Sequence, residues 1–237
     1  MLHPMLVASA EQARIAVASN FDPAMEELEQ DFEALSEHDL IVSSGATGKL
    51  YSQIRFGAPF DVFLSADTAH PQRLLDEGRA QSGSEVTYAI GRLVMWSRSH
   101  SELDATKLLD PDVDRIAIAT PMGAPYGIAA NQVFEHFELV DDVWDRLVFG
   151  ESIGQAFAFA HSGNADIGLV SASLILQLPE DEAGYSWPIP VDAHSPIMQQ
   201  AVVLRAGAEN TAAIDFMAYL KSPRAQEIIQ EYGYDTP

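Results

Sequence analysis

The stretch Ser43-Ser44-Gly45-Ala46-Thr47-Gly48-Lys49-Leu50 lies between the apolar run Leu40–Val42 and a helical pattern that begins at Leu50. It predicts a strand, a turn of small residues and a helix. Such a turn leaves backbone N–H groups uncovered, and the first N–H groups of a helix have no internal partner, so the helix dipole makes this a potential anion site. A nucleotide P-loop is excluded, because only two residues separate Gly45 from Gly48 and Leu50 follows Lys49, whereas a P-loop has four residues between its glycines and Ser or Thr after its Lys.

A second segment with the same order of elements occurs earlier in the chain. Residues Ile15–Phe21 predict a strand that ends in a small polar turn, and a helix opens at Pro23. Either turn alone is also explained by close packing of small residues between a strand and a helix. Together, the two turns would bring two helix N-termini to the carboxyl edge of one sheet, which is where open α/β sheets bind ligands.

Charge and composition restrict the ligands and partners of such a site. The 237 residues include 35 acidic and 13 basic side chains, a formal charge of −22, and no cysteine. We expect no nucleic-acid partner, because binding to nucleic acid needs a basic patch, and no disulfide or thiol chemistry. The negative field repels an anion, so an anion must be held by short-range donors in a desolvated cleft. No stretch approaches the roughly 18 apolar residues of a membrane span.

Several segments resemble one known family, the molybdate-binding proteins that serve ABC importers. The resemblance runs in order from Arg14 to Tyr234 and is carried by Val17–Phe21, Ser43–Leu50, Gly57–Asp67, Gly123–Gly127, Ile167–Val170 and Tyr219–Pro223. It implies high-affinity binding of molybdate, or of the nearly isosteric tungstate, outside the cytoplasm and delivery to the permease subunits of an ABC transporter. It also implies a monomer that is not an enzyme and has neither catalytic residues nor a cofactor.

The fold implied by the resemblance is α/β with two lobes, a periplasmic-binding-protein fold of the class II type with the ligand cleft between the lobes. Lobe 1 is expected to be discontinuous, formed by 14–90 and 191–237, and lobe 2, formed by 91–190, is inserted into it through two crossing strands. The alternation of predicted strands and helices supports an α/β fold independently. The predicted helices include Ser101–Leu109 and Ile128–Phe137.

The N-terminus resembles the end of an export signal. Residues Met1–Ala10 close with Ala8-Ser9-Ala10, the small-residue pattern of a signal-peptidase site. A basic region is missing and the apolar stretch is short, so we interpret residues 1–13 as a signal-peptide remnant, with a non-native leader as the alternative. The first interpretation predicts a periplasmic or otherwise extracytoplasmic protein.

A tetrahedral oxyanion such as molybdate accepts hydrogen bonds and, at neutral pH, donates none. A shell of hydrogen-bond donors without inward-facing acceptors matches such an anion. Hydrogenphosphate would instead leave its proton facing donors, and each mispaired buried group costs about 1–3 kcal/mol. The size of the cleft would select against the smaller sulfate. The resemblance assigns the ligand positions to Ser19, Asn20, Thr47, Tyr126 and Ile153. It implies that Ile153 acts through its backbone N–H, and Ala46 is an additional candidate.

The chain departs from the family pattern at Ser171. Some members have a Tyr directly after the strand equivalent to Ile167–Val170, and its hydroxyl donates to the anion. Serine is too short to span the same distance, so either Tyr126 supplies the phenol or the shell has one direct donor fewer; Ser171 stays an additional candidate. Lys49 is expected to be a solvated helix residue, since a strongly hydrated ammonium group is not needed where amides converge.

One alternative function is that of an α/β serine hydrolase. Residues Gly150–Gly154 match the nucleophile-elbow pattern with Ser152 at its centre, and Asp166 or Asp181 and then His194 complete the order Ser, Asp, His. The other interpretation of the same residues is a third helix N-terminus facing the cleft, which the family resemblance also implies.

A closer alternative is a binding protein of the same fold for sulfate or ferric ion. Iron sites use clustered Tyr, His and carboxylate groups, whereas the two turns carry Ser, Asn, Thr and Gly. His70, His136 and His161 are isolated in the sequence, and no His-Glu-x-x-His pattern occurs. We therefore expect no metal site apart from the molybdenum of the oxyanion itself.

Overall fold

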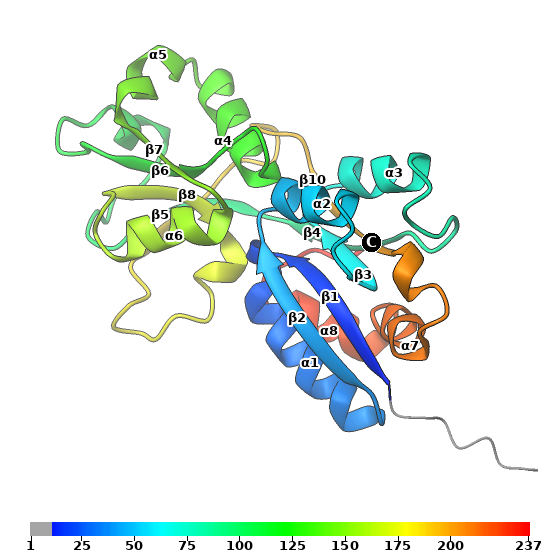
Figure 1. Ribbon diagram of the computed structural model, residues 1–237. Coiled ribbons are helices and arrows are strands. Elements are labelled where there is room, and N and C mark those ends of the chain that lie inside the picture. Colours follow the sequence, from blue (N-terminus) through cyan, green and yellow to red (C-terminus); the bar gives the residue numbers. More distant parts are fainter. Residues whose placement is uncertain (1–10) are drawn as a thin grey trace, which may run out of the picture.

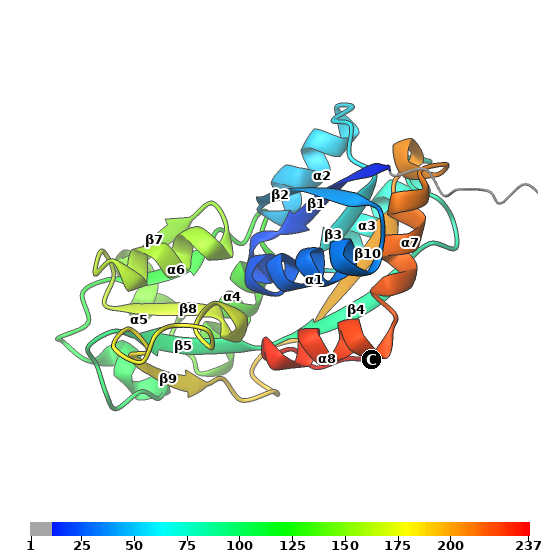
Figure 2. The ribbon, with the colours of Figure 1, turned by 90° about the horizontal axis from the view of Figure 1, so that it is seen from below.

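The strands lie in two lobes. A computed structural model describes residues 11–237 (Figure 1). Within these residues the strands form two five-stranded sheets, ordered β2-β1-β3-β10-β4 and β7-β6-β8-β5-β9. Figure 2 shows the two sheets side by side, each with its own helices. The expected two-lobed α/β fold is confirmed, and none of the helices in residues 11–237 has the length and apolar content needed to cross a membrane.

The first lobe contains the N-terminal strand. Its strands are β2 (Asp39–Gly45), β1 (Gln12–Ala18), β3 (Val62–Ser65), β10 (Ile197–Val203) and β4 (Val86–Gly91). Strand β1 runs parallel to β2 and β3, whereas β10 runs antiparallel to β3 and β4. Its helices are α1 (Asp22–Leu35), α2 (Thr47–Arg55), α3 (Ala69–Asp76), α7 (Thr211–Tyr219) and α8 (Pro223–Glu231). Because β1, β2 and β3 are parallel, the turns that follow them lie at one edge of the sheet.

The second lobe repeats the plan. Its strands are β7 (Leu147–Gly150), β6 (Ile116–Ala119), β8 (Ile167–Ser171), β5 (Leu93–Ser97) and β9 (Tyr185–Pro188). Strand β6 runs parallel to β7 and β8, and β5 runs antiparallel to β8 and β9. Its α-helices are α4 (Pro125–His136), α5 (Val140–Val143) and α6 (Ile153–His161).

Two predicted helices of the second lobe differ from the structure. In place of a helix over Ser101–Leu109, the chain forms only the short 3-10 helix Ala105–Leu109, which begins four residues after the predicted start. The helix begins there because Asp104 caps it, accepting hydrogen bonds from the backbone N–H groups of Thr106 and Lys107. Helix α4 starts at Pro125, three residues before the predicted Ile128, since proline is favoured in the first helical turn.

The chain passes between the lobes twice. Strand β4 ends at Gly91 in the first sheet and β5 begins at Leu93 in the second, and the chain returns from β9 to β10. The lobe boundaries expected at 90/91 and 190/191 stay a prediction. The expected leader, 1–13, lies outside the described residues except for its last three, of which Gln12 and Ala13 belong to β1.

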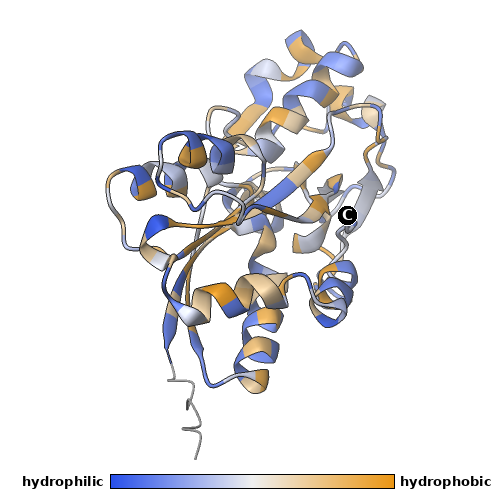
Figure 3. Cartoon of the chain, turned by 90° about the vertical axis from the view of Figure 1, so that its right-hand side faces the viewer, coloured by the Kyte–Doolittle hydropathy of each residue, from blue (hydrophilic) through white to orange (hydrophobic). Residues whose placement is uncertain are grey.

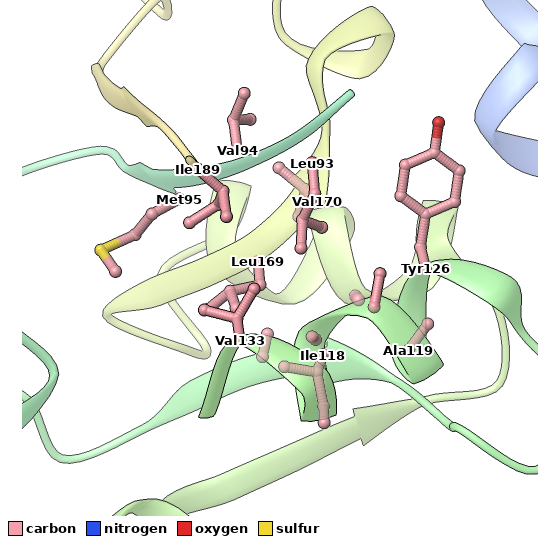
Figure 4. Packing of buried hydrophobic residues seen from close by; sticks show 14 of the residues in the cluster. Leu93, Val94, Met95, Ile118, Ala119, Tyr126, Val133, Leu169, Val170 and Ile189 are labelled. Carbon is pink, nitrogen blue, oxygen red and sulfur yellow. The ribbon is translucent and has the colours of Figure 1, made fainter. Parts of the chain in front are cut away.

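Alternate residues of β1 face opposite sides of the first sheet. Ile15 and Val17 join a buried cluster with α1, α7 and α8, whereas Ala16 joins a cluster with α2 and α3, as the period of two in a strand requires. In the second lobe, side chains such as Leu169 of β8 and Val133 of α4 form one buried cluster (Figure 4). Figure 3 shows hydrophobic and hydrophilic residues together on the helices, the pattern of helices that cover a sheet.

Candidate anion-binding site

One small pocket lies between the lobes, where the turns after β1, β2 and β3 meet the starts of α4 and α6. It leaves about 190 Å³ of space between its atoms, part of it open to solvent. None of its lining side chains is charged, and the lining consists of Ala18, Ser19, Asn20, Gly45, Ala46, Thr47, Ala66, Ala124, Pro125, Tyr126 and Ile153. The structure thus brings together all five residues assigned from the sequence, together with Ala46, but not Ser171.

Three α-helices begin at this pocket: α2 at Thr47, α4 at Pro125 and α6 at Ile153. Within residues 11–237, no group accepts a hydrogen bond from the backbone N–H of Thr47, Tyr126 or Ile153. The first N–H groups of a helix lack internal partners, and the helix dipole makes that end positive. Both lobes therefore present backbone donors suited to an anion.

Two hydroxyl groups add donors to the pocket. Thr47 Oγ1 accepts a hydrogen bond from the backbone N–H of Ala66 at 3.2 Å, and Ser19 Oγ accepts one from the backbone N–H of Gly154 at 3.3 Å. Both side chains are buried. Because each oxygen acts here as an acceptor, its own proton can be donated to a ligand.

Asn20 is held by buried polar neighbours. Its side-chain Nδ2 donates to Gln199 Oε1 at 2.9 Å and to the hydroxyl of Tyr234 at 3.0 Å. Its Oδ1 is buried and has no hydrogen-bond partner among residues 11–237. The side chain of Asn20 therefore contributes an unpaired acceptor, although an anion needs donors.

The hydroxyl of Tyr126 belongs to the polar interior and is not free. It accepts hydrogen bonds from Ser171 Oγ at 3.0 Å and Gln199 Nε2 at 3.2 Å, and Figure 4 shows it pointing away from the apolar cluster. Burial raises the pKa of Tyr126 well above the ordinary value, so the phenol stays protonated. A side chain on Gly91 would collide with this hydroxyl, which explains the glycine at the start of the passage between the lobes.

The two lobes touch directly beside the pocket. The backbone N–H of Gly48 donates to the carbonyl of Gly123 at 2.9 Å. A Cβ on Gly48 would lie 3.0 Å from the Cα of Gly123, so the close approach of the two backbones favours glycine at position 48. Lys49 forms an ion pair with Glu151 across the lobes at 3.4 Å, and both side chains are largely exposed. Lys49 is thus a solvated helix residue, as expected, and does not line the pocket.

The residues of the hydrolase alternative are not assembled into a catalytic triad. Ser152 caps α6, because its Oγ accepts a hydrogen bond from the backbone N–H of Gln155 at 3.2 Å. His194 Nδ1 lies 2.8 Å from the carbonyl of Ser195. In the described part of the chain, no hydrogen bond joins Ser152 to a histidine or a carboxylate, and no cluster of His, Asp and Glu could hold a metal ion.

Sequence reasoning missed several residues beside the pocket. Gln199 and Tyr234 are buried and hold Asn20, and a polar Gln within the apolar pattern of β10 was the available signal. Asp22 follows the first turn and accepts a hydrogen bond from Ser44 Oγ of the second turn at 2.6 Å. Burial raises the pKa of Asp22 to about 6, while the Ser44 hydrogen bond opposes this shift. A carboxyl group that is neutral below that pH thus lies beside both turns.

Known proteins are similar to this chain in sequence and in fold. The family model for bacterial extracellular solute-binding proteins matches residues 13–235. The molybdate-binding protein ModA of Rhodobacter capsulatus is 42% identical over 232 residues, which cover 98% of this chain and 91% of the relative. ModA of Azotobacter vinelandii is 42% identical over 229 residues, covering 96% and 91%. The solved structure of the Azotobacter vinelandii periplasmic molybdate-binding protein matches with a TM-score of 0.91 at 38% identity, covering 95% of this chain and 99% of that chain.

Two α/β lobes around a pocket lined by backbone and hydroxyl donors define a two-lobed solute-binding protein. The chain belongs to the bacterial extracellular solute-binding proteins and, within them, to the ModA-like family. The family resemblance drawn from the sequence is thereby confirmed. Its relatives are solute-binding proteins rather than enzymes.

Proposed function

We propose that the protein binds molybdate, and equally tungstate, with high affinity outside the cytoplasm and delivers it as a monomer to the permease subunits of an ABC importer. The observation that carries this proposal is the convergence of three helix N-termini and two hydroxyl groups on one pocket without a charged lining residue. Relatives that are 42% identical over nearly the whole chain are named molybdate-binding proteins.

The chemistry of the lining favours an acceptor-only dianion. Molybdate and tungstate use every oxygen as an acceptor, and backbone N–H and hydroxyl groups meet them without a counter-charge. Hydrogen bonds to a charged group contribute about 1.5–3 kcal/mol each, so several of them can outweigh the repulsion from a protein of net charge −22. Hydrogenphosphate places one proton against these donors and loses at least one such bond.

Four of the five assigned residues donate to the anion in the proposal, and the part played by Asn20 depends on the direction of its amide. Ser19 and Thr47 donate their hydroxyl protons, and Thr47 adds its backbone N–H. Ile153 and Tyr126 act through backbone N–H groups at the starts of α6 and α4. We expect that Tyr126 does not replace the missing Tyr at Ser171, because its hydroxyl is buried in the polar interior behind the pocket, 3.0 Å from Ser171 Oγ and 3.2 Å from Gln199 Nε2. The direct shell therefore has one phenol fewer than in some relatives.

The alternatives receive less support. Ferric ion needs carboxylate or phenolate ligands. The lining has no acidic side chain, and burial raises the pKa of Tyr126, the phenol in the lining, well above its ordinary value, which disfavours a phenolate. A serine hydrolase needs a base beside Ser152, whose hydroxyl instead caps a helix. Sulfate has the right protonation state and is excluded only by size, so it is the informative competitor.

Isothermal titration calorimetry with molybdate, tungstate, sulfate and phosphate tests the proposal. We expect molybdate and tungstate to bind with similar affinity and far more tightly than the other two. A thermal-shift panel gives an independent measure, because a ligand that binds only the folded state raises the unfolding temperature. Sulfate binding as tight as molybdate binding would overturn the proposal.

A further inference from the structure

Seven buried polar side chains form one hydrogen-bonded group behind the pocket, which we name the hinge network. Each member is at most 3% exposed, and the members are Asn20, Tyr88, Tyr126, Ser171, Ser173, Gln199 and Tyr234. The network joins the lobes: Ser173 Oγ donates to the backbone carbonyl of Asn20 at 2.6 Å, and Gln199 of β10 bonds Tyr126 of α4. Asn20 and Tyr126 also line the pocket, and Asn20 carries a side-chain atom, Oδ1, without a partner within residues 11–237.

Around the side-chain amides of Asn20 and Gln199, the hydrogen-bond donors and acceptors of the network are not fully matched. Gln199 Oε1 is approached by Asn20 Nδ2 at 2.9 Å and by the Tyr88 hydroxyl at 3.1 Å, while the single proton of Tyr88 also faces the carbonyl of Ser65 at 3.2 Å. The hydroxyl of Tyr126 receives two donors. Asn20 Oδ1 has no partner within residues 11–237, and a buried unpaired acceptor is unfavourable.

Reversing both amides about their last side-chain bonds keeps every one of these distances and changes the roles. Gln199 Nε2 then donates to Asn20 Oδ1 and to Tyr88, whose proton is left for Ser65. Tyr126 donates to Gln199 Oε1. The drawback lies at Tyr234. Its one proton already faces the Asn20 carbonyl at 2.6 Å and Ser173 Oγ at 2.9 Å, and after the reversal it also faces Asn20 Oδ1. The amide nitrogen of Asn20 takes the place of the unpaired oxygen.

We propose that Gln199 sets the direction of the Asn20 amide and thereby selects oxyanions by protonation state. When an acceptor-only dianion is bound, both amides are reversed and Asn20 Nδ2 donates to it. In the orientation of the structure, Asn20 Oδ1 would instead accept the proton of a protonated anion such as hydrogenphosphate. The anion shifts the balance between the two orientations because it interacts differently with each of them.

Gln199 suits this role because a primary amide carries a donor and an acceptor of the same shape. A side chain at position 199 that only accepts would hold Asn20 Nδ2 toward itself and fix Oδ1 as the unpaired atom. Gln199 is thus a positioning residue that acts through Asn20. This inference rests on the proposed function and names the group that determines its specificity.

The test replaces Gln199 by a glutamate and measures the ratio of molybdate to phosphate affinity by competition calorimetry. The measurement is made at about pH 10, which lies above the pKa of about 8–9 documented for buried glutamates, and phosphate is still the monoprotonated dianion there. Because both anions then carry the same charge, simple repulsion by the introduced carboxylate cancels in the ratio. We expect Gln199→Glu to lower the ratio about a hundred-fold, from one donor lost to molybdate and one acceptor gained by hydrogenphosphate.

The matched control is Gln200→Glu, which adds the same charge at the next residue of β10, outside the hinge network. We expect it to leave the ratio unchanged. An equal ratio in the Gln199→Glu and Gln200→Glu variants would overturn the inference, while wild-type protein that fails to bind molybdate would overturn the proposed function itself. The two failures are therefore distinguishable.

Neutron diffraction from crystals of the wild-type protein with molybdate decides the question even if the Gln199→Glu variant does not fold. Deuterium on the atom of Asn20 that faces the anion, and on the atom of Gln199 that faces Asn20, is the expected result. Deuterium on Asn20 toward Gln199 Oε1, as in the present orientation, would refute the reversal.

Discussion

Replacing Thr47 by Ala tests whether the anion is bound at the turn after β2. Thr47 starts α2, is 1% exposed, and accepts a hydrogen bond from the backbone N–H of Ala66. Alanine removes the hydroxyl but keeps the backbone N–H of residue 47. The lost contact with the anion is one charge-assisted hydrogen bond, about 1.5–3 kcal/mol, which corresponds to a roughly ten- to hundred-fold weaker molybdate affinity.

The same change also affects stability, and the two effects can be separated. Without Thr47 Oγ1 the N–H of Ala66 loses its acceptor, which lowers the free energy of unfolding by about 1–3 kcal/mol. Calorimetry measures the affinity, and urea unfolding followed by circular dichroism measures the stability. Thr47→Ser is the matched control, because it keeps the hydroxyl and loses only a methyl group. We expect its affinity to stay within a few-fold of wild type.

The outcome that would refute this reasoning is wild-type molybdate affinity in the Thr47→Ala variant with normal affinity in Thr47→Ser. That result would mean that the anion does not contact the turn after β2. A loss of stability without a loss of affinity would show that Thr47 acts only as the acceptor for Ala66.

The pocket and its surroundings give three further predictions. Tyr126→Phe should weaken molybdate binding much less than Thr47→Ala does, because the backbone N–H remains; calorimetry showing an equal loss would assign the phenol to the anion. Gly48→Ala places a Cβ 3.0 Å from the Cα of Gly123 and should speed molybdate release, measured by stopped-flow fluorescence; an unchanged rate would mean that the lobes need not approach there. The pKa of Asp22 is raised from 3.8 to about 6, so the folded state binds the extra proton and the free energy of unfolding should fall as pH rises through that window. The Asp22→Asn variant should lack this part of the pH dependence in urea unfolding, and an identical slope in both proteins would contradict the shift.

The sequence by itself determined the features that are encoded locally. Small polar residues directly after apolar runs, at Ser19-Asn20 and at Gly45 to Thr47, predicted helix N-termini with uncovered N–H groups, and the structure has such turns at both places. The backbone supplies these donors wherever a helix starts, so the pattern needs no long-range contact. The helix start at Ile153 was one of two interpretations of Gly150–Gly154 and was also implied by the family resemblance; the structure has this helix start, capped by the hydroxyl of Ser152.

Only the tertiary structure decided which groups meet and which way they face. Gly48 touches Gly123, and Gln199 lies against Asn20, although 179 positions separate those two amides in the chain. It also decided that the Tyr126 hydroxyl is taken up by Ser171 and Gln199. These pairings depend on the two passages of the chain between the sheets, which set distances across the pocket that no local pattern of residues contains.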